Sequence, residues 1–166
     1  MDFTSSNPED LLFDAARRGD VSTLHELIAS GLHVDTANAK GFTPLILASY
    51  DDHYDAVKFL LNAGANPNVQ DATGNTALMG VSFKGYSDVA RLLIERGADL
   101  NLQNGNGGTA LMFATLFGRN EMVRILVEAG ADKDIRDARG LTALGLAGQQ
   151  GNEEAWAVLG GEPSEA

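Results

Sequence analysis

The chain contains no cysteine, which excludes disulfide bonds and thiol chemistry. A cysteine-free chain fits the cytoplasm, although a secreted protein whose signal sequence had been removed would look the same. No apolar run is long enough to predict a transmembrane helix. The first ten residues also lack the basic and apolar segments of a signal peptide, since they read MDFTSSNPED. We therefore expect a cytoplasmic protein that does not bind membranes.

Basic side chains are scarce, with 12 Lys and Arg against 23 Asp and Glu and a net charge of −11. Nucleic acids and anionic membranes are poor partners for such a protein. The acidity lies in residues 1–73 and 140–166, because residues 74–139 carry no net charge. A partner protein with a basic surface would fit these ends. The solubility of exposed acidic ends also explains the charge without a specific docking site.

Arrangements of residues for catalysis or metal binding are missing too. The three histidines, His25, His33 and His53, have no partners at metal-ligand spacing, so we expect them to be structural or solvated. The Asp-rich segment 51–55 lacks the alternating ligands and distal Glu of a calcium loop. The Gly-rich segment 104–108 is not followed by the Gly-Lys-Ser/Thr of a phosphate loop. We predict a protein that is not an enzyme and holds no metal and no cofactor.

Glycine, in contrast, is abundant and regularly spaced. One series recurs every 33 residues, at Gly41, Gly74, Gly107 and Gly140. A second series keeps the same interval, at Gly31, Gly64, Gly97 and Gly130. Two series in phase indicate an array of one supersecondary unit. Such arrays usually bind other macromolecules.

Each unit carries the signals of two short helices. A threonine that can cap the first helix precedes an apolar segment at Thr43, Thr76, Thr109 and Thr142, with Asp10 predicted in this place in the first unit. The second helix is predicted to end at the glycines of the second series, which can adopt the left-handed conformation. Apolar triplets such as residues 92–94 cannot be buried by one helix, so neighbouring units must share a core.

The repeated motifs G-x-T-P/A-L and G-A-D/N, with an apolar run before the second, resemble those of ankyrin repeats. The resemblance covers about residues 9–160 and is closest to small bacterial ankyrin proteins. It implies an all-α solenoid of about five helix-turn-helix repeats with hairpin-like finger loops and polar terminal caps. Met79 and Met112 stand where the family often has a structural histidine, and we expect both to pack in the core.

The repeats predict a single domain at residues 9–160. It divides into a capping repeat at 9–40, full repeats at 41–73, 74–106 and 107–139, and a second capping repeat at 140–160. Glu26 stands where other units have a large apolar residue, and Gly160 and Gly161 interrupt the last helix. These polar ends are expected to be the caps of a complete small solenoid. Residues 1–8 and 161–166 are expected to be flexible tails.

In ankyrin proteins the partner usually lies against the concave face, which the finger loops and the first helices form. Carried over to this chain, the resemblance implies a partner-binding site at Phe42, Tyr50, Asp51, Asn75, Phe83, Lys84, Asn106, Leu116, Phe117, Arg139, Leu141 and Gln149. Tyr50, Phe83 and Leu116 share one repeat position and, with Phe117 beside Leu116 and Phe42 on a finger, predict a continuous apolar strip. Exposed apolar strips and aromatic residues favour a contact site. Alternatively, these rings pack between the helices and fingers.

We therefore expect a non-catalytic module that binds a partner protein as an adaptor or as an inhibitor that neutralises it, and that is a monomer when free. The alternatives are a self-associating scaffold and, through the resemblance to small bacterial ankyrin proteins, an accessory role in catalase-linked oxidative-stress defence.

Overall fold

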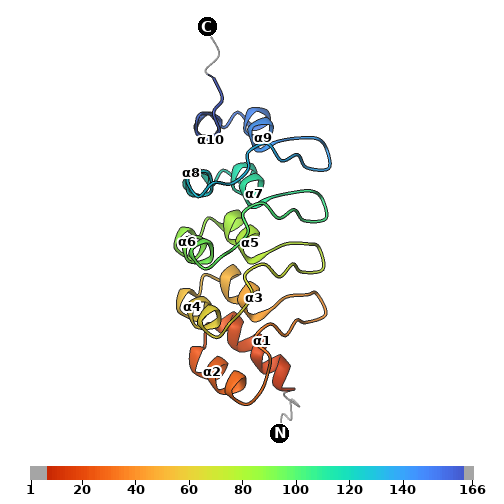
Figure 1. Ribbon diagram of the computed structural model, residues 1–166, viewed down its shortest axis with the longest axis vertical. Helices are drawn as coiled ribbons and strands as arrows, with labels where there is room; N and C mark the ends of the chain where they lie inside the picture. Colours follow the sequence, from red (N-terminus) through yellow and green to blue (C-terminus); the bar gives the residue numbers. More distant parts are fainter. Residues whose placement is uncertain (1–6, 163–166) are drawn as a thin grey trace.

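Ten helices follow one another in residues 7–162, the part of the chain that this computed structural model describes (Figure 1). They are α1 Pro8–Arg18, α2 Val21–Ala29, α3 Pro44–Tyr50, α4 Tyr54–Asn62, α5 Ala77–Lys84, α6 Ser87–Glu95, α7 Ala110–Leu116, α8 Asn120–Glu128, α9 Ala143–Gln150 and α10 Glu153–Val158. The predicted tails lie mostly outside these residues.

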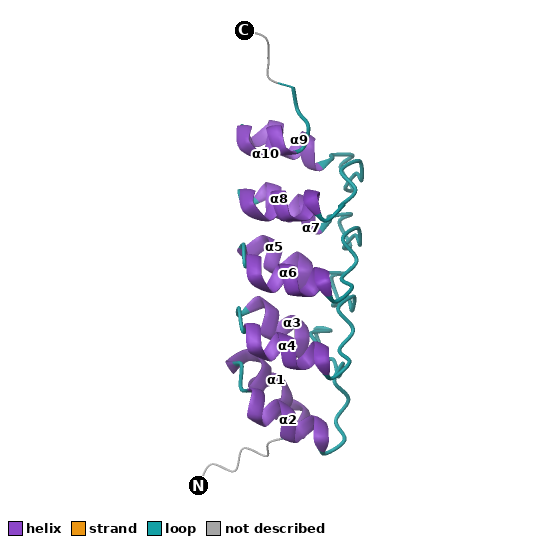
Figure 2. Ribbon diagram, turned by 60° about the vertical axis from the view of Figure 1, so that its left-hand side comes forward, coloured by secondary structure: helices purple, strands orange, loops and turns teal. Residues whose placement is uncertain are grey.

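The helices form five antiparallel pairs that stack in chain order, with the two ends of the chain at opposite ends of the stack (Figure 1). We call the odd-numbered helices inner and the even-numbered helices outer. A finger loop projects beside the inner helices at each of the four junctions between pairs, and the loops line one edge of the stack (Figure 2). No strand occurs within residues 7–162. This arrangement confirms the predicted all-α solenoid.

The core is a set of columns in which one repeat position is buried in successive pairs. Leu60, Leu93, Leu126 and Leu159 form one column between the outer and inner helices. Burying a leucine side chain contributes about 1.5–3 kcal/mol relative to leaving it exposed. A single helix pair cannot bury such a column alone, so each pair depends on its neighbours.

Threonine caps begin four of the inner helices, as predicted. The Oγ1 atoms of Thr43, Thr76, Thr109 and Thr142 each accept a hydrogen bond from the backbone N–H three residues later, at 3.1–3.3 Å. The prediction of Asp10 as the first cap is wrong. Helix α1 begins earlier, at Pro8, and Asn7 Oδ1 accepts from Glu9 N at 3.1 Å. The Asn-Pro pair supplies both a cap and a proline at the first helical position.

The turn inside each helix pair requires a left-handed residue. Four pairs have glycine there, and the pair α3–α4 has Asp52, which is the one non-glycine residue with positive φ in the described chain (φ 60°). A non-glycine residue in this conformation costs about 1–2 kcal/mol.

The C-terminal end of the stack closes over the only tryptophan. Gly161 N donates to Trp156 O at 2.8 Å, and Trp156 Nε1 donates to Glu162 O at 3.1 Å. A Cβ atom on Gly161 would lie 2.2 Å from the indole ring, so only glycine fits. These bonds hold Gly161 and Glu162 against α10, next to the predicted end of the domain at residue 160.

The expectation that two methionines pack in the core holds. Met79 and Met112 are buried, and Thr76 N donates to Met79 Sδ at 3.4 Å. Helix Gly80 lies beneath Tyr50, whose Cδ2 would be 3.3 Å from an added Cβ.

Among residues 7–162, no helix combines the length and the apolar character that a membrane span requires.

Candidate functional site

The four finger loops share one internal hydrogen-bond pattern. An Asn or Asp side chain at the start of each loop accepts hydrogen bonds from two backbone N–H groups at the tip. Asp71 Oδ1 accepts from Thr73 N at 2.9 Å and from Asn75 N at 3.0 Å. Asn38, Asn104 and Asp137 do the same in the other loops. A side chain that satisfies two backbone donors defines the shape of a turn.

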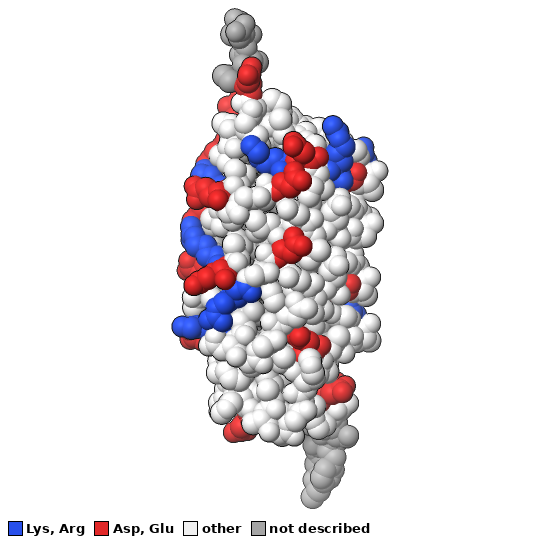
Figure 3. All heavy atoms as spheres, viewed as in Figure 1, with Lys and Arg blue, Asp and Glu red and all other residues white. Residues whose placement is uncertain are grey.

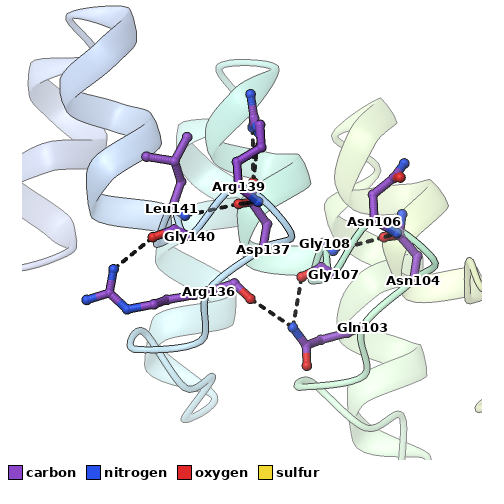
Figure 4. A network of polar contacts seen from close by, with 10 residues as sticks. All are labelled: Gln103, Asn104, Asn106, Gly107, Gly108, Arg136, Asp137, Arg139, Gly140 and Leu141. Atoms are coloured by element: carbon purple, nitrogen blue, oxygen red, sulfur yellow. Dashed lines mark hydrogen bonds and ion pairs between the residues drawn. The ribbon is translucent and has the colours of Figure 1, made fainter.

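Each finger is also joined to the next. The backbone bond Ala138 N to Asn106 O measures 2.9 Å, and the equivalent bonds Ala72 N to Lys40 O and Gly105 N to Thr73 O measure 3.0 and 2.9 Å. Gln103 Nε2 adds two side-chain bonds of 3.0 Å, to Gly107 O in its own finger and to Arg136 O in the next (Figure 4). The fingers therefore form one connected sheet-like layer, which reduces the entropy lost when a partner binds.

An aromatic row crosses the ends of the inner helices; we define it as Tyr50, Phe83 and Phe117. The rings of Tyr50 and Phe83 are parallel with centroids 6.4 Å apart, and the ring of Phe117 meets Phe83 edge-to-face at 4.5 Å. Tyr50 and Phe117 remain 43% and 45% exposed. Phe117, which follows Leu116 in the sequence, therefore supplies the third ring of the row, and Leu116 lies half-buried in the lining of the second groove described below.

A cation lies against this row. The Nζ atom of Lys84 is 4.7 Å from the centre of the Tyr50 ring, within the range of a cation–π contact. Nearby, Arg119 Nε donates to Phe83 O at 3.0 Å and His53 Nε2 lies 2.7 Å from Arg17 O. His53 and Arg119 therefore each join a helix pair to the preceding inner helix, which agrees with the structural role expected of His53.

Two grooves lie between the inner helices and the fingers; we call this hollowed surface the concave face. The first groove, of about 410 Å³, is lined mainly by Phe42, Ile46, Tyr50, Asp51 and Asn75, with Arg17, Leu47, Asp71, Thr76 and Gly80 completing it. The second, of about 300 Å³, has the equivalent position two repeats later and includes Asn106, Leu116 and Arg139. The aromatic row runs from Tyr50, which lines the first groove, to Phe117, which follows Leu116 of the second groove in the sequence.

Seven of the twelve sequence-predicted site residues line these grooves, and Phe83, Lys84 and Phe117 lie in or against the aromatic row. Leu141 is half-buried, with its N–H on Asp137 Oδ1 at 3.0 Å, and Gln149 is exposed on α9; neither lines a groove or joins the row. Sequence reasoning missed Arg17, Ile46 and Asp71. Arg17 occupies the same repeat position as Tyr50 and Phe83, so the 33-residue interval could have identified it.

Asp137 is the most strongly held carboxylate on the concave face. The N–H of Leu141, together with the side chain and N–H of Arg139, lowers the pKa of Asp137 below its ordinary value, although burial opposes this shift. Arg139 Nη2 lies 3.0 Å from the carboxylate. Asp137 is therefore a structural acceptor that stays charged, and it is not placed to exchange protons near neutral pH.

A further cavity of about 580 Å³ lies at the C-terminal end of the stack, lined by residues such as Gly148, Asn152 and Trp156. It is larger than either groove. Within residues 7–162, no cluster of three or more His, Cys, Asp or Glu side chains is arranged to hold a metal ion.

Comparison with known proteins agrees with this geometry. The sequence pattern described as ankyrin repeats in three copies matches residues 12–104 and, in a second overlapping match, residues 81–163. The chain belongs to the ankyrin-repeat family. Ankyrin repeats generally mediate interactions between proteins and are typically non-catalytic.

Individual ankyrin-repeat relatives match only part of the chain. Ankyrin repeat domain-containing protein 29 of Danio rerio is 40% identical over 39% of this chain and 22% of its own length. An ankyrin repeat, SAM and basic leucine zipper domain-containing protein of Ornithorhynchus anatinus is 39% identical over 37% of this chain and 13% of its own. An ankyrin repeat protein of Pseudomonas aeruginosa is 45% identical over 28% of each. The chain thus spans less than a third of these relatives.

Proposed function

We propose that this ankyrin-repeat protein binds a segment of another protein on its concave face, without chemistry of its own, as an adaptor or as an inhibitor of that partner. The observation that carries this proposal is the aromatic row. Two of its rings are more than two-fifths exposed, although a soluble fold gains by burying them. Exposed aromatic side chains beside grooves are the residues that most often dominate interface energies.

Rigidity supports the same proposal. The fingers are joined by backbone hydrogen bonds, and the rings of the row hold one another through stacking and edge contacts. A preorganised surface of this kind loses little entropy on binding. We propose a cytoplasmic bacterial setting for this interaction, in keeping with the absence of cysteine and the similarity to the Pseudomonas protein.

A pull-down from the source cells tests the proposal with matched variants. The test variant is Tyr50→Ser combined with Phe117→Ser, which removes exposed rings without opening the core. The control is Tyr54→Ser, because Tyr54 is 41% exposed but begins the outer helix α4. We expect a stoichiometric protein to be captured by the wild type and the control and lost from the test variant.

Equal capture by all three baits would place the binding site elsewhere on the molecule. Self-association is the competing function, since an exposed aromatic row can also pair with a second copy. Light scattering over a concentration series distinguishes the two: a mass that rises with concentration in the wild type but not in the test variant would indicate a scaffold.

A further inference from the structure

Among the described residues, the cations beside the first groove have no acidic partners, whereas Arg139 in the second groove pairs with Asp137. Within residues 7–162, the side chains of Arg17, Lys40 and Lys84 take part in no ion pair and no hydrogen bond; Lys84 contacts only the Tyr50 ring. Arg17 lines the first groove, and Lys84 lies against the ring that borders it. Two free positive charges therefore flank Tyr50.

The outer helices show the opposite arrangement. Acidic and basic side chains alternate along that edge of the molecule (Figure 3). Arg91 pairs with Glu121 and Arg124 pairs with Glu154, each across a repeat boundary. Arg91 and Arg124 on the outer edge are thus compensated within the protein, although the chain as a whole carries a charge of −11.

Two of the carboxylates on the concave face accept hydrogen bonds from the protein backbone. Asp71 and Asp137 accept hydrogen bonds from backbone N–H groups of their own fingers. Among the described residues, Asp51 beside the first groove takes part in no ion pair. The face thus carries charges of both signs, which does not suit a polyanion such as nucleic acid, and its unpaired cations suit a segment of mixed apolar and acidic character.

We propose that the partner contributes a segment with a large apolar side chain next to Asp or Glu. The apolar side chain enters the first groove between Phe42 and Tyr50, and the carboxylate meets Lys84 or Arg17. This inference rests on the proposed function and names the chemistry of its partner. It differs from the expectation of a basic partner based on net charge alone, because Arg17 and Lys84 beside the first groove have no acidic partner among the described residues.

Selection of random 12-residue peptides displayed on phage against the full chain tests this proposal, followed by affinity measurement of the enriched peptides as synthetic probes. We expect enrichment of aromatic or aliphatic residues adjacent to Asp or Glu. Lys84→Glu should weaken such peptides by about tenfold or more, since it replaces an attractive contact by a repulsive one. Lys58→Glu is the matched control, because Lys58 is exposed on the outer helix α4 and its reversal changes the net charge equally.

The outcomes separate the two proposals. Peptides rich in Lys or Arg, or acidic peptides weakened equally by both charge reversals, would overturn the acidic-segment proposal; loss of binding in the Tyr50→Ser, Phe117→Ser variant would then leave the concave face as the site. Enriched peptides that bind this double variant as tightly as the wild type, or no enrichment at all, would contradict both proposals.

Discussion

Replacing Gly107 by alanine tests whether the contacts between fingers stabilise the fold. Gly107 has φ +75°, and an added Cβ would lie 2.9 Å from Ala138 N and 3.0 Å from Asp137 Cα, both in the backbone of the next finger. That finger must move away, which breaks the 2.9 Å bond from Ala138 N to Asn106 O. Gly140 offers a matched control, because it has φ +82° in the last finger and an added Cβ would meet nothing within 4 Å.

The magnitudes follow from this difference. The left-handed conformation costs alanine about 1–2 kcal/mol at either position. The displaced finger and lost hydrogen bond add about 1–2 kcal/mol at Gly107 alone. Gly107→Ala should therefore lower the free energy of unfolding by about 3 kcal/mol, or Tm by roughly 6–12 °C, and Gly140→Ala by about half as much. Urea unfolding followed by circular dichroism measures both, and equal losses would show that the fingers do not stabilise one another.

Three smaller predictions concern other single side chains. Asp52→Gly should raise the free energy of unfolding by about 0.5 kcal/mol, because relief of the strained φ exceeds the greater freedom of glycine in the unfolded chain; a loss in urea unfolding would refute this. Ser49 Oγ is buried with no hydrogen-bond partner among the described residues, so Ser49→Ala should leave the free energy of unfolding unchanged or raise it by about 1 kcal/mol. Ser82 is the control: Ser82→Ala loses a 2.7 Å hydrogen bond to Leu78 O and should lower the free energy of unfolding. The lowered pKa of Asp137 means that its charged form stabilises the fold above the unfolded pKa of about 3.9, and that this stability is lost as pH falls through the folded pKa. Asp137→Asn should therefore lose less stability than the wild type between about pH 5 and pH 2 in acid titrations followed by circular dichroism, and an identical acid loss would contradict that reading.

The regular parts of the fold were predictable because one physical requirement recurs every 33 residues. Each threonine cap and left-handed glycine stands at the same place in its unit, so four copies support each interpretation. The first unit has no such support. Its cap, Asn7, lies three residues before the predicted Asp10. The first unit lacks the repeated Gly-x-Thr motif, and the pair Asn7-Pro8 begins α1 instead.

The candidate site was predictable in its position but not in its detail. Equal repeat positions indicate which side chains lie side by side, and Tyr50 and Phe83 do stack. The repeat interval alone could not show that Phe117, one position beyond Leu116, meets Phe83 edge-to-face. The sequence also could not show that the carboxylates of Asp71 and Asp137 accept hydrogen bonds from backbone N–H groups of their fingers, since those bonds depend on the geometry of the loops.

Amide hydrogen exchange of the chain, alone and with its captured partner, tests most directly whether the partner lies on the concave face. Backbone N–H groups in the finger loops and at the ends of the inner helices should exchange more slowly in the complex, above all within residues 38–53, 71–86 and 104–118. The outer helices α4, α6 and α8 should exchange at unchanged rates. Protection confined to those outer helices, with the fingers unaffected, would contradict the proposed binding face.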